Sequence, residues 1–218
     1  MLVSRNGNGR SRCFWWPGGA RPELTKGTDM RMIKLTVAGA VLGTVLGSMA
    51  LASPAHADTR TCSGTIRSAS VDDIRVPKGA RCTLLGTRVD GNVKVASDAT
   101  LVARGVRVDG DIQADDARSV SVSSGSQVDG NIQVEDTGVV TVLSTRVDGD
   151  IQLEDNRRSV RVEGNRVSGN VEVEENRGSV RVQRNAVRGD LECESNRRGV
   201  SGGNNSVRGD KEGQCRRL

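Results

Sequence analysis

The sequence predicts an all-β protein that folds as a single-domain parallel β-solenoid of about seven coils, each of roughly 19–20 residues. Three observations predict this fold. A short motif returns at a nearly fixed spacing, apolar and polar residues alternate within each repeat, and two pairs of cysteines are each separated by about one repeat. Periods near this length are typical of solenoid proteins, in which each repeat packs only on its neighbours.

The repeated motif is Val-x-Gly followed by Asn or Asp and then by Ile, Val or Leu. The first copy is Val89-Asp90-Gly91-Asn92-Val93, and a degenerate last copy runs from Val207 to Lys211. The motif glycines recur at a spacing of 19 or 20, at Gly91, Gly110, Gly130, Gly149, Gly169, Gly189 and Gly209. Left-handed hexapeptide coils use about 18 residues, so we expect a right-handed solenoid.

Alternation with period two runs through each repeat and indicates strands that are buried on one face. In Val147-Asp148-Gly149-Asp150-Ile151-Gln152-Leu153 the odd positions are apolar or Gly, and a second alternating stretch follows at Ser159–Val162. Turn-forming residues such as those at 155–158 separate the two stretches. Asn156, Asn176 and Asn196 line up at one of these turns, and stacked turn amides are most simply structural. We therefore expect Val147, Ile151, Leu153, Val160 and Val162 to point inward, and coils stacked at about 4.8 Å to form a rod of roughly 34 Å.

Both ends of the repeat array carry paired cysteines. Cys62 and Cys82 are separated by one repeat length, and Cys193 and Cys215 by slightly more. Because one coil in sequence is one layer in a solenoid, each pair is placed to form a disulfide between an end coil and its neighbour. A Cys₄ zinc site would need closer clustering of the cysteines. The stretch at 73–76 aligns with 92–95 and predicts one further, degenerate coil at the N-terminal end.

The N-terminal region predicts export. Residues 30–57 combine a positively charged start, an apolar segment and a small-residue end at Ala55-His56-Ala57, which are the parts of a secretory signal peptide cleaved between Ala57 and Asp58. A membrane anchor is the alternative, and we expect the mature chain not to span a membrane. We interpret residues 1–29 as an extension from a wrongly assigned start codon; a long n-region is the alternative. The β-solenoid domain is then 58–218.

The apparent basic charge of the chain belongs to the region before Asp58. Of 32 Lys and Arg, seven precede Asp58, and of 27 Asp and Glu, two do, so 25 of each sign remain. A formally neutral domain argues against nucleic acid as a partner. The mature chain also has no Phe, Tyr, Trp, His or Met. Without these, general bases are limited to carboxylates and Lys, and sugar-stacking platforms are absent, so we expect no enzyme activity.

The repeats resemble the β-helical core of bactofilins, which are polymer-forming bacterial cytoskeletal proteins. The resemblance covers roughly residues 85–211, and copies such as Val108–Ile112 and Val147–Ile151 carry it. The whole mature chain, ending in Gly209–Cys215, is similar to small exported β-solenoid proteins of actinobacteria whose function is unknown. Bactofilins are intracellular, lack disulfides and polymerise through open solenoid ends. The two stapled ends predicted here argue against end-to-end polymerisation, although other self-association stays open.

Two outward columns flank the motif glycine. The column before it, the Asp column, reads Asp90, Asp109, Asp129 and Asp148 and then Ser168, Arg188 and Arg208. The column after it alternates through Asn92, Asp111, Asn131, Asp150, Asn170 and Asp190. Interleaved amides keep carboxylates from stacking directly, since like charges on neighbouring strands repel; this structural interpretation is our preferred one. The alternative is a calcium groove, because paired carboxylate columns offer oxygen ligands. Its candidate ligands are Asp109, Asp111, Asp129, Asp148 and Asp150.

Further charged columns predict an interaction surface or a solubilising one. An acidic column runs through Asp115, Glu135, Glu154, Glu174 and Glu194, and turn arginines are placed to offset it. Arg88, Arg107, Arg146 and Arg166 precede the Asp column by two residues and share its face. Cross-strand ion pairing is the simplest interpretation; recognition of a cell-wall or extracellular polymer is the functional one.

The sequence thus predicts a secreted, non-enzymatic β-solenoid without a required cofactor, acting as a structural or binding module at the cell envelope or outside the cell. The alternative is a carboxylate- or calcium-dependent enzyme that acts on polysaccharides from a β-helix scaffold.

Overall fold

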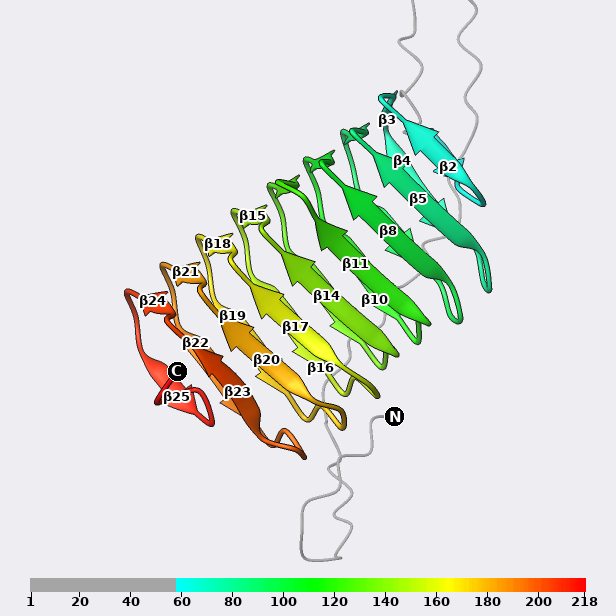
Figure 1. Ribbon diagram of the computed structural model, residues 1–218. Helices are drawn as coiled ribbons and strands as arrows, with labels where there is room; N and C mark the ends of the chain where they lie inside the picture. The colour runs from blue at the N-terminus through cyan, green and yellow to red at the C-terminus, as the bar shows by residue number, and fades with distance from the viewer. Residues whose placement is uncertain (1–57) are drawn as a thin grey trace, which may run out of the picture. The chain divides into compact units, whose positions relative to one another are not determined.

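A computed structural model describes residues 58–218 as a stack of parallel β-strands without a helix (Figure 1). The predicted extension at 1–29 and the predicted signal peptide at 30–57, including Ala57, lie outside the described residues. Nothing in residues 58–218 forms a helix of the length and apolarity needed to cross a membrane.

Three sheets run the length of the stack, and each coil contributes one strand to each of them. Sheet A consists of β1 (Thr59–Thr61), β4 (Asp73–Val76), β7 (Val93–Val95), β10 (Ile112–Asp115), β13 (Ile132–Glu135), β16 (Ile151–Glu154), β19 (Val171–Glu174), β22 (Leu191–Glu194) and β25 (Lys211–Gly213). Sheet B consists of β2 (Thr65–Arg67), β5 (Arg81–Leu85), β8 (Thr100–Arg104), β11 (Ser119–Ser123), β14 (Val139–Leu143), β17 (Val160–Glu163), β20 (Val180–Gln183) and β23 (Val200–Gly203). Sheet C consists of β3 (Ser70–Val71), β6 (Arg88–Val89), β9 (Arg107–Val108), β12 (Gln127–Val128), β15 (Arg146–Val147), β18 (Arg166–Val167), β21 (Ala186–Val187) and β24 (Ser206–Val207).

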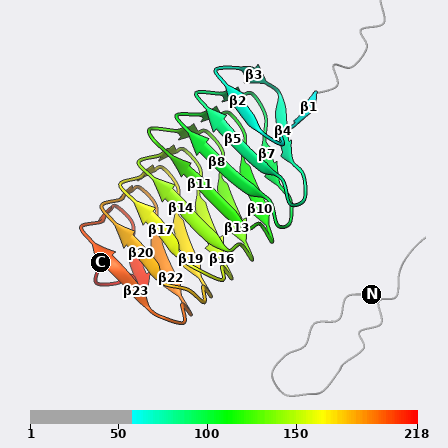
Figure 2. The same cartoon turned by 45° about the vertical axis from the view of Figure 1, so that its right-hand side comes forward.

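Every strand pairs in parallel with its counterpart one coil away, so equivalent residues stack in columns. Ile112 lies beside Ile132, which lies beside Ile151, and the same register continues to Val171 and Leu191. The eight strands of sheet C are joined by seven steps, which is about seven turns of coil. The predicted all-β parallel solenoid with coils of about 20 residues is therefore confirmed, and Figure 2 shows its layers edge-on.

The core is a set of aliphatic columns between the three sheets. Val147, Ile151, Leu153, Val160 and Val162, which the alternation places inward, are each at most 1% exposed. The stacked side chains of this core are aliphatic or cysteine, so the interior is packed without aromatic rings. The degenerate N-terminal coil is also confirmed, because β4 pairs with β7 through Ile74 and Val93 and through Val76 and Val95.

Both ends of the stack carry a cysteine pair, and the C-terminal end has further hydrogen bonds. The structure brings both predicted cysteine pairs within disulfide distance, with Cα atoms 5.5 Å apart for Cys62 and Cys82 and 5.2 Å apart for Cys193 and Cys215. At the C-terminal end, the Lys211 amino group donates to the carbonyl oxygens of Asn205 (2.9 Å) and Leu218 (2.5 Å). The last residues thus fold back onto the end coil and satisfy carbonyl groups there.

Candidate functional site

The column after the motif glycine is a hydrogen-bonded ladder at the corner between sheets C and A. Each side chain accepts, through its Oδ1 atom, the backbone N–H of the column residue in the next coil. Asn92 accepts from Asp111 (2.9 Å), Asp111 from Asn131 (2.7 Å) and Asn131 from Asp150 (2.8 Å), and the same bond recurs from Asp73 through Asp210. Asn and Asp are interchangeable in this role because both present Oδ1 as an acceptor.

The ladder explains the motif glycine. A Cβ atom at Gly149 would lie 2.2 Å from Asn131 Oδ1 and 2.7 Å from the Gly130 carbonyl oxygen. Real Cβ atoms do not approach oxygen atoms so closely, so the position requires glycine for space and not for an unusual backbone angle. The same crowding recurs at the glycines of the neighbouring coils.

Each of the five predicted calcium ligands already has a hydrogen-bonding partner within the chain. Asp111 and Asp150 use Oδ1 in the ladder. Asp109, Asp129 and Asp148 accept hydrogen bonds from arginines of sheet C. Within residues 58–218, no group of three His, Cys, Asp or Glu side chains is arranged to hold a metal ion. The geometry favours the structural interpretation of these columns.

The arginines of sheet C form a zipper with the aspartates two residues on. Arg107 donates to Asp109 in its own coil (3.2 Å) and to Asp129 in the next (3.1 Å), and Arg88 bridges Asp90 and Asp109 in the same way. Arg146 pairs with Asp148 (3.0 Å). The zipper ends there, because the column of aspartates continues as Ser168, Arg188 and Arg208. All these arginine side chains are about half exposed, so each pair contributes well under 1 kcal/mol.

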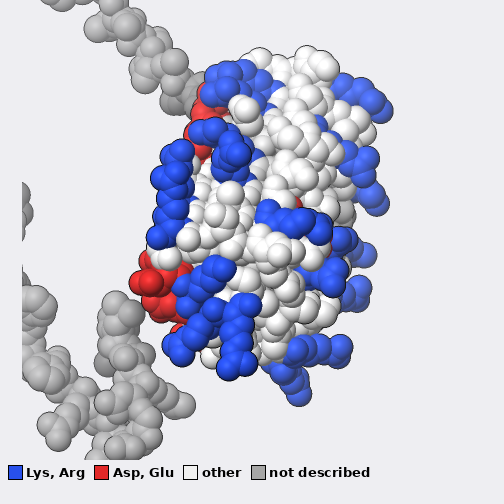
Figure 3. Space-filling view, turned by 60° about the vertical axis from the view of Figure 1, so that its left-hand side comes forward, with Lys and Arg blue, Asp and Glu red and all other residues white. Residues whose placement is uncertain are grey.

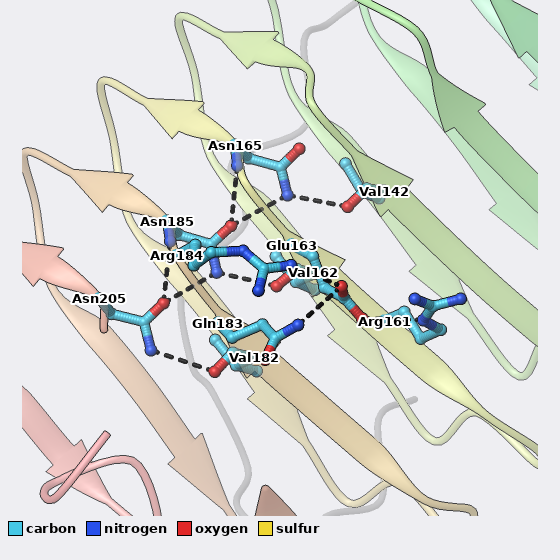
Figure 4. Close-up of polar contacts among 10 residues, drawn as sticks. All are labelled: Val142, Arg161, Val162, Glu163, Asn165, Val182, Gln183, Arg184, Asn185 and Asn205. Atoms are coloured by element: carbon cyan, nitrogen blue, oxygen red, sulfur yellow. Dashed lines mark hydrogen bonds and ion pairs between the residues drawn. The ribbon is translucent and has the colours of Figure 1, made fainter. Parts of the chain in front are cut away.

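Two further ladders are buried inside the turns. Asn156, Asn176 and Asn196 form the first, which continues into Gln214, and Asn165, Asn185 and Asn205 form the second. Each asparagine accepts a backbone N–H from the preceding coil and donates its Nδ2 to a carbonyl of an inner strand, as Asn185 does to Val162 at 2.8 Å (Figure 4). No buried side-chain nitrogen or oxygen of the described residues lacks a partner, so the polar interior is satisfied.

Glu163 is a buried carboxylate beside the second ladder. Its side chain is 8% exposed and accepts from Arg161 (2.8 Å), Gln183 (2.9 Å) and Arg184 (3.5 Å), as Figure 4 shows. The pKa of the Glu163 carboxyl is lowered, chiefly by the hydrogen bond from Arg161, although burial acts in the opposite direction. Glu163 therefore stays ionised and fixes the outer edge of β17.

The outer face of sheet A carries two columns of acids that are in no ion pair within the described residues. In its C-terminal half, Glu172, Glu192 and Glu212 stack in one column, next to the acidic column predicted from the sequence. The pKa values of Glu174 and Glu192 are raised, first by burial and then by the neighbouring carboxylates. In its N-terminal half the face has an open hollow of about 540 Å³, lined by Arg75, Lys94, Gln113, Gln133, Asp115 and Glu135 among others.

The turn arginines do not offset this acidic column. Arg177 pairs with Asp155 (3.2 Å), and Arg157 pairs with Asp116, so both bind aspartates of the turns themselves. Among the described residues, no ion pair involves Asp115, Glu135, Glu154, Glu174 or Glu194. In one view of the surface, Lys and Arg side chains are spread over the face, and Asp and Glu side chains gather mainly along one edge (Figure 3).

Sequence reasoning found the first buried ladder and missed the second. Asn165, Asn185 and Asn205 recur at the same spacing as Asn156, Asn176 and Asn196, so the signal was present. The burial of Glu163 has no such signal, because its column holds Leu143 and Gln183 in the neighbouring coils.

Comparison of the chain with protein-family models, with curated proteins and with solved structures finds no match.

Proposed function

We propose that the protein is an exported, non-enzymatic β-solenoid that acts as a structural or binding module at the cell envelope or outside the cell. The observation that carries the proposal is that the inward and outward residues of each coil have different roles. The interior and the corners are committed to holding one coil to the next, through aliphatic columns and three side-chain ladders. Three continuous sheet surfaces face outward, and those of sheets A and C carry regularly spaced charges.

Several features support a location outside the cell. Two cysteine pairs lie at disulfide distance, and disulfides persist in oxidising compartments. The predicted signal peptide agrees with this location.

The likeness of the repeats to the bactofilin core supports a structural role.

An extended polymer of the envelope is the partner class that such surfaces fit. Parallel columns repeat at about 4.8 Å, so a chain-like ligand would meet the same groups several times along the rod. Repeated weak contacts of this kind add up through effective concentration. No catalytic step is needed for this role.

The test is co-sedimentation of the protein, with its disulfides formed, with insoluble cell-wall material. It is repeated with calcium, with EDTA and at high salt. Binding that high salt abolishes and EDTA leaves unchanged is the expected result, because charged side chains and no metal would make the contact. Loss of binding in EDTA, or a large rise in melting temperature with calcium, would instead favour a calcium site. Absence of binding under every condition would contradict a role at the wall.

A further inference from the structure

Two surfaces of the solenoid carry charge columns that run in opposite orders. We define the sheet A strip as two outward columns of sheet A and the sheet C strip as two outward columns at sheet C. The first column of the sheet A strip is Arg75, Lys94, Gln113, Gln133, Gln152, Glu172, Glu192 and Glu212, and its second column is Asp115, Glu135, Glu154, Glu174 and Glu194. The first column of the sheet C strip is Arg88, Arg107, Gln127, Arg146, Arg166, Ala186 and Ser206, and its second column is Asp72, Asp90, Asp109, Asp129, Asp148, Ser168, Arg188 and Arg208.

The sign of the charge reverses along one column of each strip. The first column of the sheet A strip begins with Arg75 and Lys94 and ends with three glutamates. The second column of the sheet C strip begins with aspartates and ends with Arg188 and Arg208. At both ends of the stack, these two columns therefore carry charges of opposite sign.

The C-terminal parts of both strips stack like charges without relief. Arg188 and Arg208 are exposed and occupy one column, and neither has an ion-pair partner among the described residues. The same holds for Glu192 and Glu212 on sheet A. Like charges on neighbouring strands, about 4.8 Å apart, destabilise a sheet. Contact between the basic end of one strip and the acidic end of the other, at the same spacing, would reduce the repulsion within both.

We propose that this surface belongs to a second copy of the protein, whose sheet A strip packs against the sheet C strip of the first, with both rods pointing the same way and in register. The spacing matches in both directions. Along the rod, coil stacking sets one repeat for both strips, and across it, the two columns of each strip are two residues apart.

The pairing of columns follows from the geometry of facing strands. When two rods point the same way, the strands on facing surfaces run in opposite directions, so the second column of one strip meets the first column of the other. Seven pairs of opposite charge then face each other and no pair of like charge: Asp72 with Arg75, Asp90 with Lys94, Arg188 with Glu192, Arg208 with Glu212, Arg107 with Asp115, Arg146 with Glu154, and Arg166 with Glu174. Asp90, Arg107 and Arg146 also belong to the zipper of sheet C, so the other four pairs bring together charges that have no ion-pair partner among the described residues.

The charge pattern also disfavours the reversed arrangement. If one rod is turned end for end, the second columns of the two strips meet. Asp90, Asp109, Asp129 and Asp148 then lie opposite Glu194, Glu174, Glu154 and Glu135, and like-charge contacts of this kind suppress wrong pairings. The order of residues along the strips therefore specifies the polarity of the contact.

The contact joins different surfaces, so its assembly does not stop at two copies. A strip about 34 Å long and two columns wide covers on the order of 400 Å² per copy, which is about half of what a stable interface buries. We therefore expect association at high protein concentration and low salt, with larger species in rapid exchange with the monomer.

The experiment is sedimentation velocity on the protein recovered after expression of the full chain in a secreting host, over a range of concentrations. The expected result is a concentration-dependent rise in mass at about 0.01 M salt that disappears at about 1 M salt, where the screening length falls to about 3 Å. A monomer at every concentration in low salt would overturn the proposal and would leave the strips to a different charged partner.

Charge reversal separates this contact from general stickiness. One variant carries Arg188→Glu and Arg208→Glu, and a second carries Glu192→Arg and Glu212→Arg. We expect each alone to lose association and an equimolar mixture to regain it, because the two variants then complement each other's strips. The matched control is Arg67→Glu with Arg104→Glu, which makes the same change in net charge on exposed residues of sheet B.

Two outcomes of this series contradict the proposal. One is association of the Arg188→Glu, Arg208→Glu variant equal to that of the unaltered protein. The other is a mixture that stays monomeric while the control variant still associates. Circular dichroism of each variant verifies that the β-fold is retained. The result is independent of the envelope role, because only pure protein is present.

Discussion

Single side chains hold each coil to the next at three corners of the solenoid. Asn185 makes several such hydrogen bonds in its turn. Its Oδ1 accepts the Asn165 N–H at 3.0 Å, and its Nδ2 donates to the backbone carbonyl oxygen of Val162 and to the side-chain Oδ1 of Asn205. Because the site is buried, each of these groups loses its partner without access to water if the amide is removed.

We predict that Asn185→Ala lowers the free energy of unfolding by roughly 2 kcal/mol or more, since an orphaned buried donor or acceptor costs about 1–3 kcal/mol. Urea denaturation followed by far-ultraviolet circular dichroism measures it. Ser206→Ala, an exposed change on β24 in the next coil, serves as the control and should stay within about 0.5 kcal/mol. Equal effects of the two substitutions would contradict a special role for the ladder.

The stacked glutamates of sheet A make a prediction about pH. Because the folded-state pKa of Glu192 is raised, protonation favours the folded state: its stabilising effect is complete below the unfolded-state pKa and is lost as the pH rises through the folded-state pKa. Glu192→Gln should therefore raise the melting temperature at neutral pH, and the gain should vanish in acid. A gain that persists unchanged at acid pH would show that charge is not its cause.

Glu163 is the matched comparison, because its pKa is shifted the other way. Its contribution is present above the unfolded-state pKa and is lost as the pH falls through the folded-state value. Glu163→Gln should therefore lower the melting temperature at neutral pH, and the loss should shrink in acid.

At the scale of the strand and its turn, each repeat depends on a close approach between backbones at the motif glycine. We predict that Gly149→Ala destabilises the protein by about 1–3 kcal/mol, because the new methyl group would overlap Asn131 Oδ1 and force the corner apart. Thermal denaturation measures the change. Gly64→Ala is the control, since no atom lies within 4 Å of its added Cβ. Replacing glycine by alanine lowers the entropy of the unfolded chain and by itself favours folding, so a comparable loss of stability at Gly64 would show that crowding at the corner is not the cause.

The strands could be predicted from the sequence because their signal is local and repeated. Alternation at Val147–Leu153 assigns the inward face without knowledge of its neighbours, and the repeat period supplies the register. The partners of the charged residues could not be predicted in this way. Arg157 reaches the turn aspartate Asp116 two coils away and not the acidic column, because the reach of a long side chain depends on the turn geometry.

Over the whole molecule, stability is a sum over neighbouring coils, so the ends are where unfolding begins. Cys193→Ala with Cys215→Ala should lower the free energy of unfolding by about 3 kcal/mol, as expected for the loss of a crosslink around a loop of about 20 residues. Hydrogen exchange should show the loss of protection first at β22 and β25. Cys62→Ala with Cys82→Ala should move the fraying to β2 and β5, and a uniform loss of protection in either variant would contradict end-first opening.

The C-terminal cap has a consequence for how such a molecule changes size. Gln214 continues the first buried ladder by accepting the Asn196 N–H, and it also donates to the Asn196 carbonyl, which in the earlier coils pairs with a backbone N–H of the next coil. A duplicated segment of one coil length within the array would bring its own ladder rungs and leave this cap intact. Duplication of single coils would therefore lengthen the stack in steps of about 4.8 Å without a change at either end.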